Sequence, residues 1–338
     1  MTFSYTSGLI VMLCAMFLYG SWSTVLKFIK KYPPYAIVTF MMWSAFIFVW
    51  LIILIFGDRL IPGGFVNDVK HDVQKAVFVA ICGAMDCWGI QCQLEGIKRV
   101  GLVLTAPVKT ACLMVSGITV SALIGGVDPS TSIAGVAAAV VIFVAGSYIG
   151  ARASFMHLVD VNGGNLSSGE EAESRKSQRL DIVLVLLACL FMCPFHAVAY
   201  SAASKTPIHP EGFEPLTLTG VFVTGSAIAS FAGTFVISRI KNEKEVILHP
   251  EIGWKKLLLI SAAAGTAIYT GKILNAYATP SISAVISTTI GNAGAIWNYF
   301  WGIVLGEYKG SQPRTIRTLA LGIGLFLIGL IVVTVNAA

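Results

Sequence analysis

The chain is dominated by long apolar stretches that short polar connections separate. Ten of these stretches have about 20 residues or more, the length that an α-helix needs to cross ~30 Å of hydrocarbon. They are predicted at 6–26, 35–56, 76–97, 101–125, 131–151, 181–203, 215–238, 256–278, 282–305 and 315–335. Because little chain remains outside them, the sequence predicts an all-α polytopic membrane protein with ten transmembrane helices and with its function among those helices.

A polar segment at 152–180 separates the first five predicted helices from the last five. It is mixed in charge and poor in apolar residues, which is typical of a flexible linker. We therefore expect a first five-helix repeat at 1–151 and a second at 181–338. An odd number of helices per half gives the halves opposite orientations in the membrane, so the predicted plan is two inverted repeats.

Weak internal similarity favours a duplication of this kind. Aligning the two predicted halves so that Gly83 meets Gly265 also sets Gly89 on Gly271. The same alignment brings the polar third helix onto the polar eighth helix, as expected if one half arose from the other.

Composition agrees with a membrane protein and limits the partners. The 338 residues are 56% hydrophobic and 12% charged, whereas about a quarter of the residues of a soluble domain are charged. The net charge of +6 does not predict nucleic acid as a partner, because the basic residues concentrate on one side of the predicted topology. The opposite side holds Arg59, Lys70, Lys75 and Lys205. The linker is thus expected in the cytoplasm and both termini outside, in a plasma membrane or an inner membrane.

The sequence predicts neither an enzyme nor a cofactor. All seven cysteines lie within predicted helices and lack the spacing of a zinc site, so we expect no metal. No zinc-protease or nucleophile-elbow signature is present. The predicted partners are the lipid bilayer, a small-molecule solute and protons, and a homodimer is left open.

Three charged residues lie in the apolar stretch from Gly83 to Lys109. A charge at the centre of a bilayer costs about 2.5 to 3.5 kcal/mol on insertion scales, so each one needs a partner, water or a function. Asp86 lies near mid-membrane, and we interpret it as the proton-coupling acid, with a structural ion pair as the alternative. Glu95 lies one turn from the basic boundary at Lys98, so it is either an interfacial acid or a functional one.

Polar residues on the neighbouring predicted helices are candidates for solute binding. Lys109 is too deep in the fourth helix for easy snorkelling, and Gln93 shares a helical face with Asp86. Lys272, with Asn275 one turn away, either pairs with Asp86, contacts solute or snorkels outward.

The ninth predicted helix offers amide and aromatic groups. Asn292 and Tyr299 share one stripe, and Trp297 lies on another; these residues either bind a ring-shaped polar solute or pack the core. Trp22 and His196 are secondary candidates, with interfacial anchoring and neutral packing as their respective alternatives.

Three segments carry a resemblance to known families. The segment FWGIVLGEYKGSQPRT at 300–315 resembles the end of the ninth helix and the following loop of ureide permeases, in the drug/metabolite transporter superfamily. The segments GAMDCWGIQCQLEGIKRVGLVL at 83–104 and LYGSWSTVLKFIKKYP at 18–33 resemble both these permeases and the rhamnose-proton symporters.

This resemblance implies the drug/metabolite transporter fold and a secondary active transporter. A ureide permease would imply proton-coupled uptake of a small neutral metabolite such as a ureide or a nucleobase. The alternatives are a proton-coupled, rhamnose-like sugar symporter and an exporter of drugs or metabolites.

Overall fold

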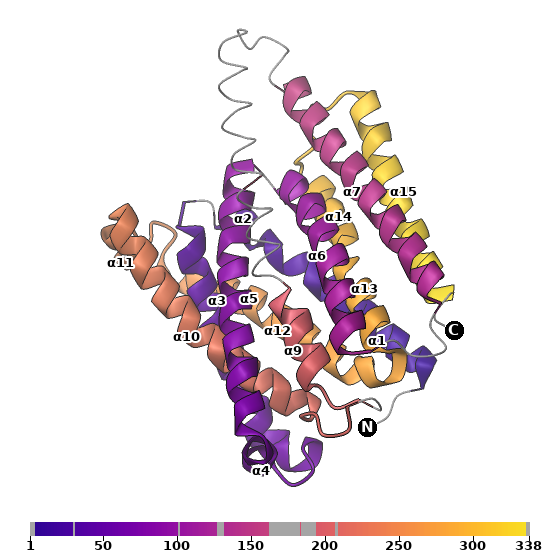
Figure 1. Ribbon diagram of the computed structural model, residues 1–338. Helices are drawn as coiled ribbons and strands as arrows, with labels where there is room; N and C mark the ends of the chain where they lie inside the picture. Colours follow the sequence, from indigo (N-terminus) through magenta and orange to yellow (C-terminus); the bar gives the residue numbers. More distant parts are fainter. Residues whose placement is uncertain are drawn as a thin grey trace.

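The structure of the protein, a computed structural model, is a bundle of long helices (Figure 1). It describes residues 4–335 except 30, 101, 127–131, 162–182, 184–193 and 207–208. In chain order the helices are α1 (Tyr5–Ser21), η1 (Trp22–Thr24), α2 (Val25–Phe28), α3 (Pro34–Leu60), α4 (Phe65–His71), α5 (Val73–Val100), α6 (Leu102–Ile124), α7 (Ile133–Val161), α9 (Phe195–Ala203), α10 (Pro215–Lys241), α11 (Lys244–Leu248), α12 (Trp254–Ile282), α13 (Ala284–Asn292), α14 (Ala295–Val304) and α15 (Pro313–Val335).

Within the described part of the chain, seven helical segments are long and apolar enough to cross a membrane. They are Tyr5–Phe28, Pro34–Leu60, Val73–Lys98, Ile133–Val161, Pro215–Lys241, Trp254–Ile282 and Pro313–Val332. Large apolar side chains such as Leu54, Leu123 and Ile240 are at least three-quarters exposed on the outer faces of the bundle, where lipid would cover them. The protein is an all-α integral membrane protein with several spanning helices.

Three of the predicted helices differ from the structure by more than about four residues at an end or by an interruption. The helix predicted at 131–151 continues to Val161 as α7, because apolar residues such as Phe155 and Val159 extend into the segment assigned to the linker. The helix predicted at 282–305 is divided into α13 and α14, and the one predicted at 6–26 is interrupted by η1. Most of the helix predicted at 181–203 lies outside the described residues, and only its last part is seen, as α9.

Helices from the two halves of the sequence pack in pairs across the bundle. α7 lies beside α15 along one edge, and α5 packs on α10 (Figure 1). Glycines permit close approaches: a Cβ atom at Gly83 would overlap the carbonyl oxygen of Phe222, and one at Gly265 would overlap the carbonyl oxygen of Met41. The two halves of the sequence therefore contribute to one packed bundle.

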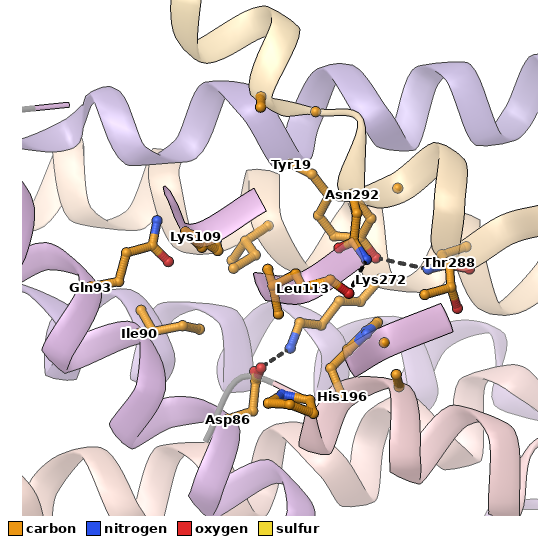
Figure 2. Close-up of a pocket in the computed structure, with 18 of the residues that line it drawn as sticks. Tyr19, Asp86, Ile90, Gln93, Lys109, Leu113, His196, Lys272, Thr288 and Asn292 are labelled. Carbon is orange, nitrogen blue, oxygen red and sulfur yellow. Dashed lines mark hydrogen bonds and ion pairs between the residues drawn. The ribbon is translucent and has the colours of Figure 1, made fainter. Parts of the chain in front are cut away.

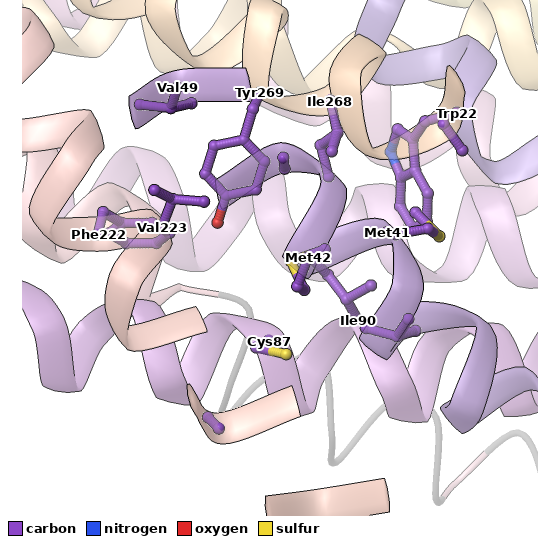
Figure 3. Close-up of a cluster of buried hydrophobic side chains, with 14 of the residues drawn as sticks. Trp22, Met41, Met42, Val49, Cys87, Ile90, Phe222, Val223, Ile268 and Tyr269 are labelled. Atoms are coloured by element: carbon purple, nitrogen blue, oxygen red, sulfur yellow. The ribbon is translucent and has the colours of Figure 1, made fainter. Parts of the chain in front are cut away.

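Buried apolar side chains form two separate cores. The first lies among α2, α3, α5, α9, α10 and α12, and Figure 3 shows part of it around Met41, Met42 and Phe222. The second lies among α1, α6, α7, the end of α12, and α13 to α15, with Phe143 and Phe326 at its centre. Both cores take helices from both halves of the sequence, and the junction between them positions the candidate site.

Candidate functional site

A cavity of about 110 Å³ lies between the two cores (Figure 2). Its walls combine aromatic rings, amides and charged side chains in a bundle that is otherwise apolar. It is lined by Tyr19, Trp22, Asp86, Ile90, Gln93, Lys109, Leu113, Gly117, Pro194, His196, Ala197, Ile268, Lys272, Asn275, Thr288, Gly291, Asn292, Gly294, Ala295 and Asn298.

Two helices lose their regular hydrogen bonding where they border this cavity. The first changes from α1 to η1 at Ser21 and Trp22. Between α13 and α14 the amides of Gly294 and Trp297 bond to carbonyls three residues back, at 3.2 and 3.0 Å, instead of four. Irregular backbone at membrane depth is tolerated where it lines a cavity, and it is a feature of transporter binding sites.

The two interruptions touch each other at a pair of glycines. A Cβ atom at Gly20 would overlap the carbonyl oxygen of Gly294, so only glycine allows the helices to cross here. Beside this crossing, the buried Ser23 hydroxyl donates to Oδ1 of Asn298 at 2.7 Å. The crossing therefore joins the first helix to the ninth directly at the cavity wall.

A buried ion pair connects α5 to α12 inside the cavity. Lys272 Nζ lies 2.6 Å from Asp86 Oδ2, and the two side chains are only 4% and 9% exposed (Figure 2). The structure thus shows pairing with Asp86 and excludes outward snorkelling of Lys272, while contact with solute stays a prediction, since Lys272 also lines the cavity. The Lys272 ammonium also lies over the rings of Phe222 and Tyr269, 4.2 and 5.1 Å from their centroids.

Hydrogen bonds fix the surroundings of this ion pair. The Tyr269 hydroxyl donates to Ser226 Oγ at 2.8 Å, and Ser226 Oγ donates to the Gly83 carbonyl at 2.9 Å. This chain links α12 to α10 and α5, one turn from Asp86. The acid is thus held on a rigid part of the first core.

Lys109 enters the cavity without an acidic partner among the described residues. Its Nζ lies 5.6 Å from the ring centroid of Trp22, and Asp86, the acid in the cavity wall, already pairs with Lys272. Gln93 lines the same cavity at 2% exposure, and its buried Oε1 has no hydrogen-bond partner in the described part of the chain. These two side chains offer a cation and an amide to a bound solute.

The other amides are partly engaged by the protein. Asn275 Nδ2 donates to the Tyr19 hydroxyl at 3.3 Å, and Asn292 Nδ2 donates to the Leu113 carbonyl at 3.2 Å. These bonds orient both side chains at the cavity wall. The aromatic ring of Tyr19 and the amide of Asn298 also line the cavity. The sequence does not predict these two residues as part of the site, because their place in the wall depends on how the helices pack.

Three of the predicted site residues lie outside the cavity. The Tyr299 ring is fully buried in the second core with its hydroxyl against Gly150 of α7, and Trp297 packs edge-on against Phe17. Glu95 forms an ion pair with Lys241 of α10 at 2.9 Å, so the structure gives it a basic partner from the other half of the sequence. The secondary candidates Trp22 and His196, by contrast, both line the cavity.

The described residues contain no cluster of three or more His, Cys, Asp or Glu side chains that could hold a metal ion. His196 stacks on Tyr200 at a centroid distance of 4.3 Å, and its buried Nε2 has no partner among the described residues. The cavity wall therefore contains aromatic rings, hydrogen-bonding groups and ionisable side chains.

Comparison with known proteins supplies the fold but no function. No family model matches the chain, and no curated protein matches it. The chain is similar to a solved structure described as "Crystal structure of protein", with 14% sequence identity over 99% of each chain and a TM-score of 0.51. At that identity the similarity shows that this arrangement of helices occurs in a crystallised protein of the same extent, and it shows the fold alone.

Proposed function

We propose that this protein is a secondary active transporter that moves a small polar metabolite across a membrane by alternating access. The observation that carries the proposal is the polar cavity between two cores, bordered by two interrupted helices that touch at Gly20 and Gly294. A binding site at discontinuous helices near mid-membrane is the usual plan of secondary transporters. The aromatic and amide groups in its wall suit a ureide or a nucleobase.

The Asp86–Lys272 ion pair supports proton coupling in this proposal. The acid and the base come from different halves of the sequence, on α5 and α12. A proton on Asp86 removes the charge that holds Lys272, so proton binding and separation of the two helices would favour each other. The proton arriving from one side of the membrane would thereby bias the change of access.

Matching helix contacts support the proposed ten-helix inverted repeat. The alignment that sets Gly83 on Gly265 also sets Met41 on Val223. Gly83 meets the backbone of Phe222, next to Val223, while Gly265 meets the backbone of Met41. These glycine contacts, one between α5 and α10 and one between α12 and α3, therefore correspond under the same alignment to within one residue, as expected for two repeats around a pseudo-twofold axis.

Transport is tested with purified protein in liposomes. We expect counterflow of a labelled ureide or nucleobase, and accumulation of that solute when a proton gradient is imposed. Asp86→Asn should abolish proton-driven accumulation and spare exchange, whereas Asp58→Asn, at the exposed end of α3, should leave both intact. Undiminished accumulation by Asp86→Asn would exclude Asp86 as the coupling acid, and absence of counterflow with every solute tried would refute transport.

A further inference from the structure

The charges that line the cavity do not cancel. Asp86 contributes one negative charge, while Lys272 and Lys109 contribute two positive charges. Asp86 and Lys272 neutralise each other at 2.6 Å. The charge of Lys109 is left with the quadrupole of the Trp22 ring at 5.6 Å, a much weaker interaction than an ion pair.

An uncompensated cation inside a membrane protein is unfavourable, and it persists where it has a function. Lys109 lies on α6 on the same side of the cavity as Gln93 (Figure 2). The Trp22 ring lies on that side as well, because its centroid is 5.6 Å from Lys109 Nζ. The buried Oε1 of Gln93 accepts hydrogen bonds and has no donor among the described residues. Among the described residues, therefore, Lys109 has no negative charge to pair with and Gln93 Oε1 has no hydrogen-bond donor, and a bound solute that carries both groups would satisfy them.

We infer that the transported solute is a monoanion, a small planar molecule that carries a carboxylate and an N–H group. This inference rests on the proposed transport function and replaces the neutral solute that the sequence favours. The carboxylate would pair with Lys109, the N–H group would donate to Gln93 Oε1, and the aromatic rings of Trp22, Tyr19 and His196 would flank the planar part.

The charge of the solute decides whether proton-coupled transport is electrogenic. A neutral solute carried with one proton moves net charge across the membrane, whereas a monoanion carried with one proton moves none. Transport by the wild-type protein would therefore respond to a proton gradient and not to a membrane potential applied without one.

Isosteric pairs of solutes test the inference directly. Orotate is compared with orotamide, pyrrole-2-carboxylate with pyrrole-2-carboxamide, and imidazole-4-carboxylate with imidazole-4-carboxamide, by the shift that each produces in the unfolding temperature of the full-length protein in detergent. Every member of these pairs carries a ring N–H group, so the two members of a pair differ in the charge of one substituent. At least one anion should protect the wild-type protein at a concentration tenfold or more below that of its neutral partner. Lys109→Gln should weaken that binding about 10- to 100-fold, the usual loss of a charge-assisted hydrogen bond.

Two control variants separate binding from folding. Lys98→Gln removes a lysine from the exposed end of α5 and should leave anion binding unchanged. Lys109→Gln without ligand should unfold at the same temperature as the wild type or higher, because it removes a charge that has no partner. A large loss of stability in ligand-free Lys109→Gln would mean that Lys109 is structural and would overturn the inference.

The remaining outcomes distinguish this inference from the transport proposal itself. If neutral members of the pairs are exchanged across liposomes and the anions are not, the protein is a transporter and the inference about the anion is wrong. It is also wrong if no anion in the panel protects the protein, or if Lys109→Gln binds the anion as tightly as the wild type does. Failure of all solutes in counterflow would instead refute transport.

Discussion

The Asp86–Lys272 ion pair should make a large, strongly coupled contribution to stability. The pair is almost fully buried, and its charged atoms lie 2.6 Å apart. At an effective dielectric constant of about 20, two unit charges at this separation attract by about 6 kcal/mol, while removing each from water costs several kcal/mol. Breaking such a pair from one side usually costs about 3 to 5 kcal/mol, because the other charge stays buried without a partner.

A double-mutant cycle measures this coupling. We expect Asp86→Asn and Lys272→Met each to lower the free energy of unfolding by about 3 to 5 kcal/mol, and the double variant to lie closer to the wild type than either single variant. Equilibrium unfolding in mixed micelles gives the four free energies.

The exposed ion pair of Glu95 with Lys241 is the matched control on the same helix, α5. Its side chains are 25% and 35% exposed, so the coupling from Glu95→Gln and Lys241→Met should stay at or below about 1 kcal/mol. If the effects of Asp86→Asn and Lys272→Met simply add, the two charges do not stabilise each other, and the reasoning from burial and distance is refuted.

Two further predictions concern the backbone and the helix ends. Gly20→Ala should disrupt the crossing with Gly294 and therefore lower both the unfolding temperature and the rate of transport. The control is Gly324→Ala, whose added Cβ atom has no neighbour within 4 Å; it should leave transport unchanged and leave stability unchanged or slightly higher. Equal behaviour of the two variants would contradict a close crossing. Asp72 accepts from the Lys75 amide at 2.8 Å at the start of α5, and its pKa is lowered by this bond and by the Lys75 ammonium. Because the folded pKa lies below the unfolded value of about 3.9, the stability that Asp72 contributes is present above that pH and is lost as the pH falls through the folded pKa. The difference in unfolding temperature between wild type and Asp72→Asn should therefore disappear on acidification, and a difference that grows towards low pH would reverse the sign of the argument.

The lengths of the apolar stretches predicted most of the helices, because the hydrocarbon core of a membrane leaves a single spanning chain few backbone conformations other than the α-helix. Each stretch must satisfy its own hydrogen bonds, so α3, α5, α10 and α12 begin and end within about four residues of their predicted positions. The sequence could not predict the interruption between α13 and α14. Ala293 and Gly294 are compatible with a continuous helix, and the contact with Gly20 that accompanies the break comes from a segment far away in sequence.

The sequence predicted the kinds of side chain that line the cavity, but it predicted only some of the residues themselves. Depth in the membrane singled out Asp86, Lys109 and Lys272, because a buried charge is unfavourable wherever the helices lie. Helical stripes also selected Tyr299, which is buried in the second core, and Trp297, which is partly exposed; neither residue lines the cavity. A stripe shows which residues share a helix face, but it does not show which neighbour that face meets.

The sequence by itself therefore determined an all-α membrane protein with charged residues that require partners. Only the tertiary structure decided which charge is paired and which is not. Asp86 is close in sequence to Lys109, yet it pairs with Lys272 from the other half of the chain, since α5 and α12 bring the two side chains within 2.6 Å. Pairing depends on distance in the folded bundle, and it is this assignment that leaves Lys109 as the cation available to a solute.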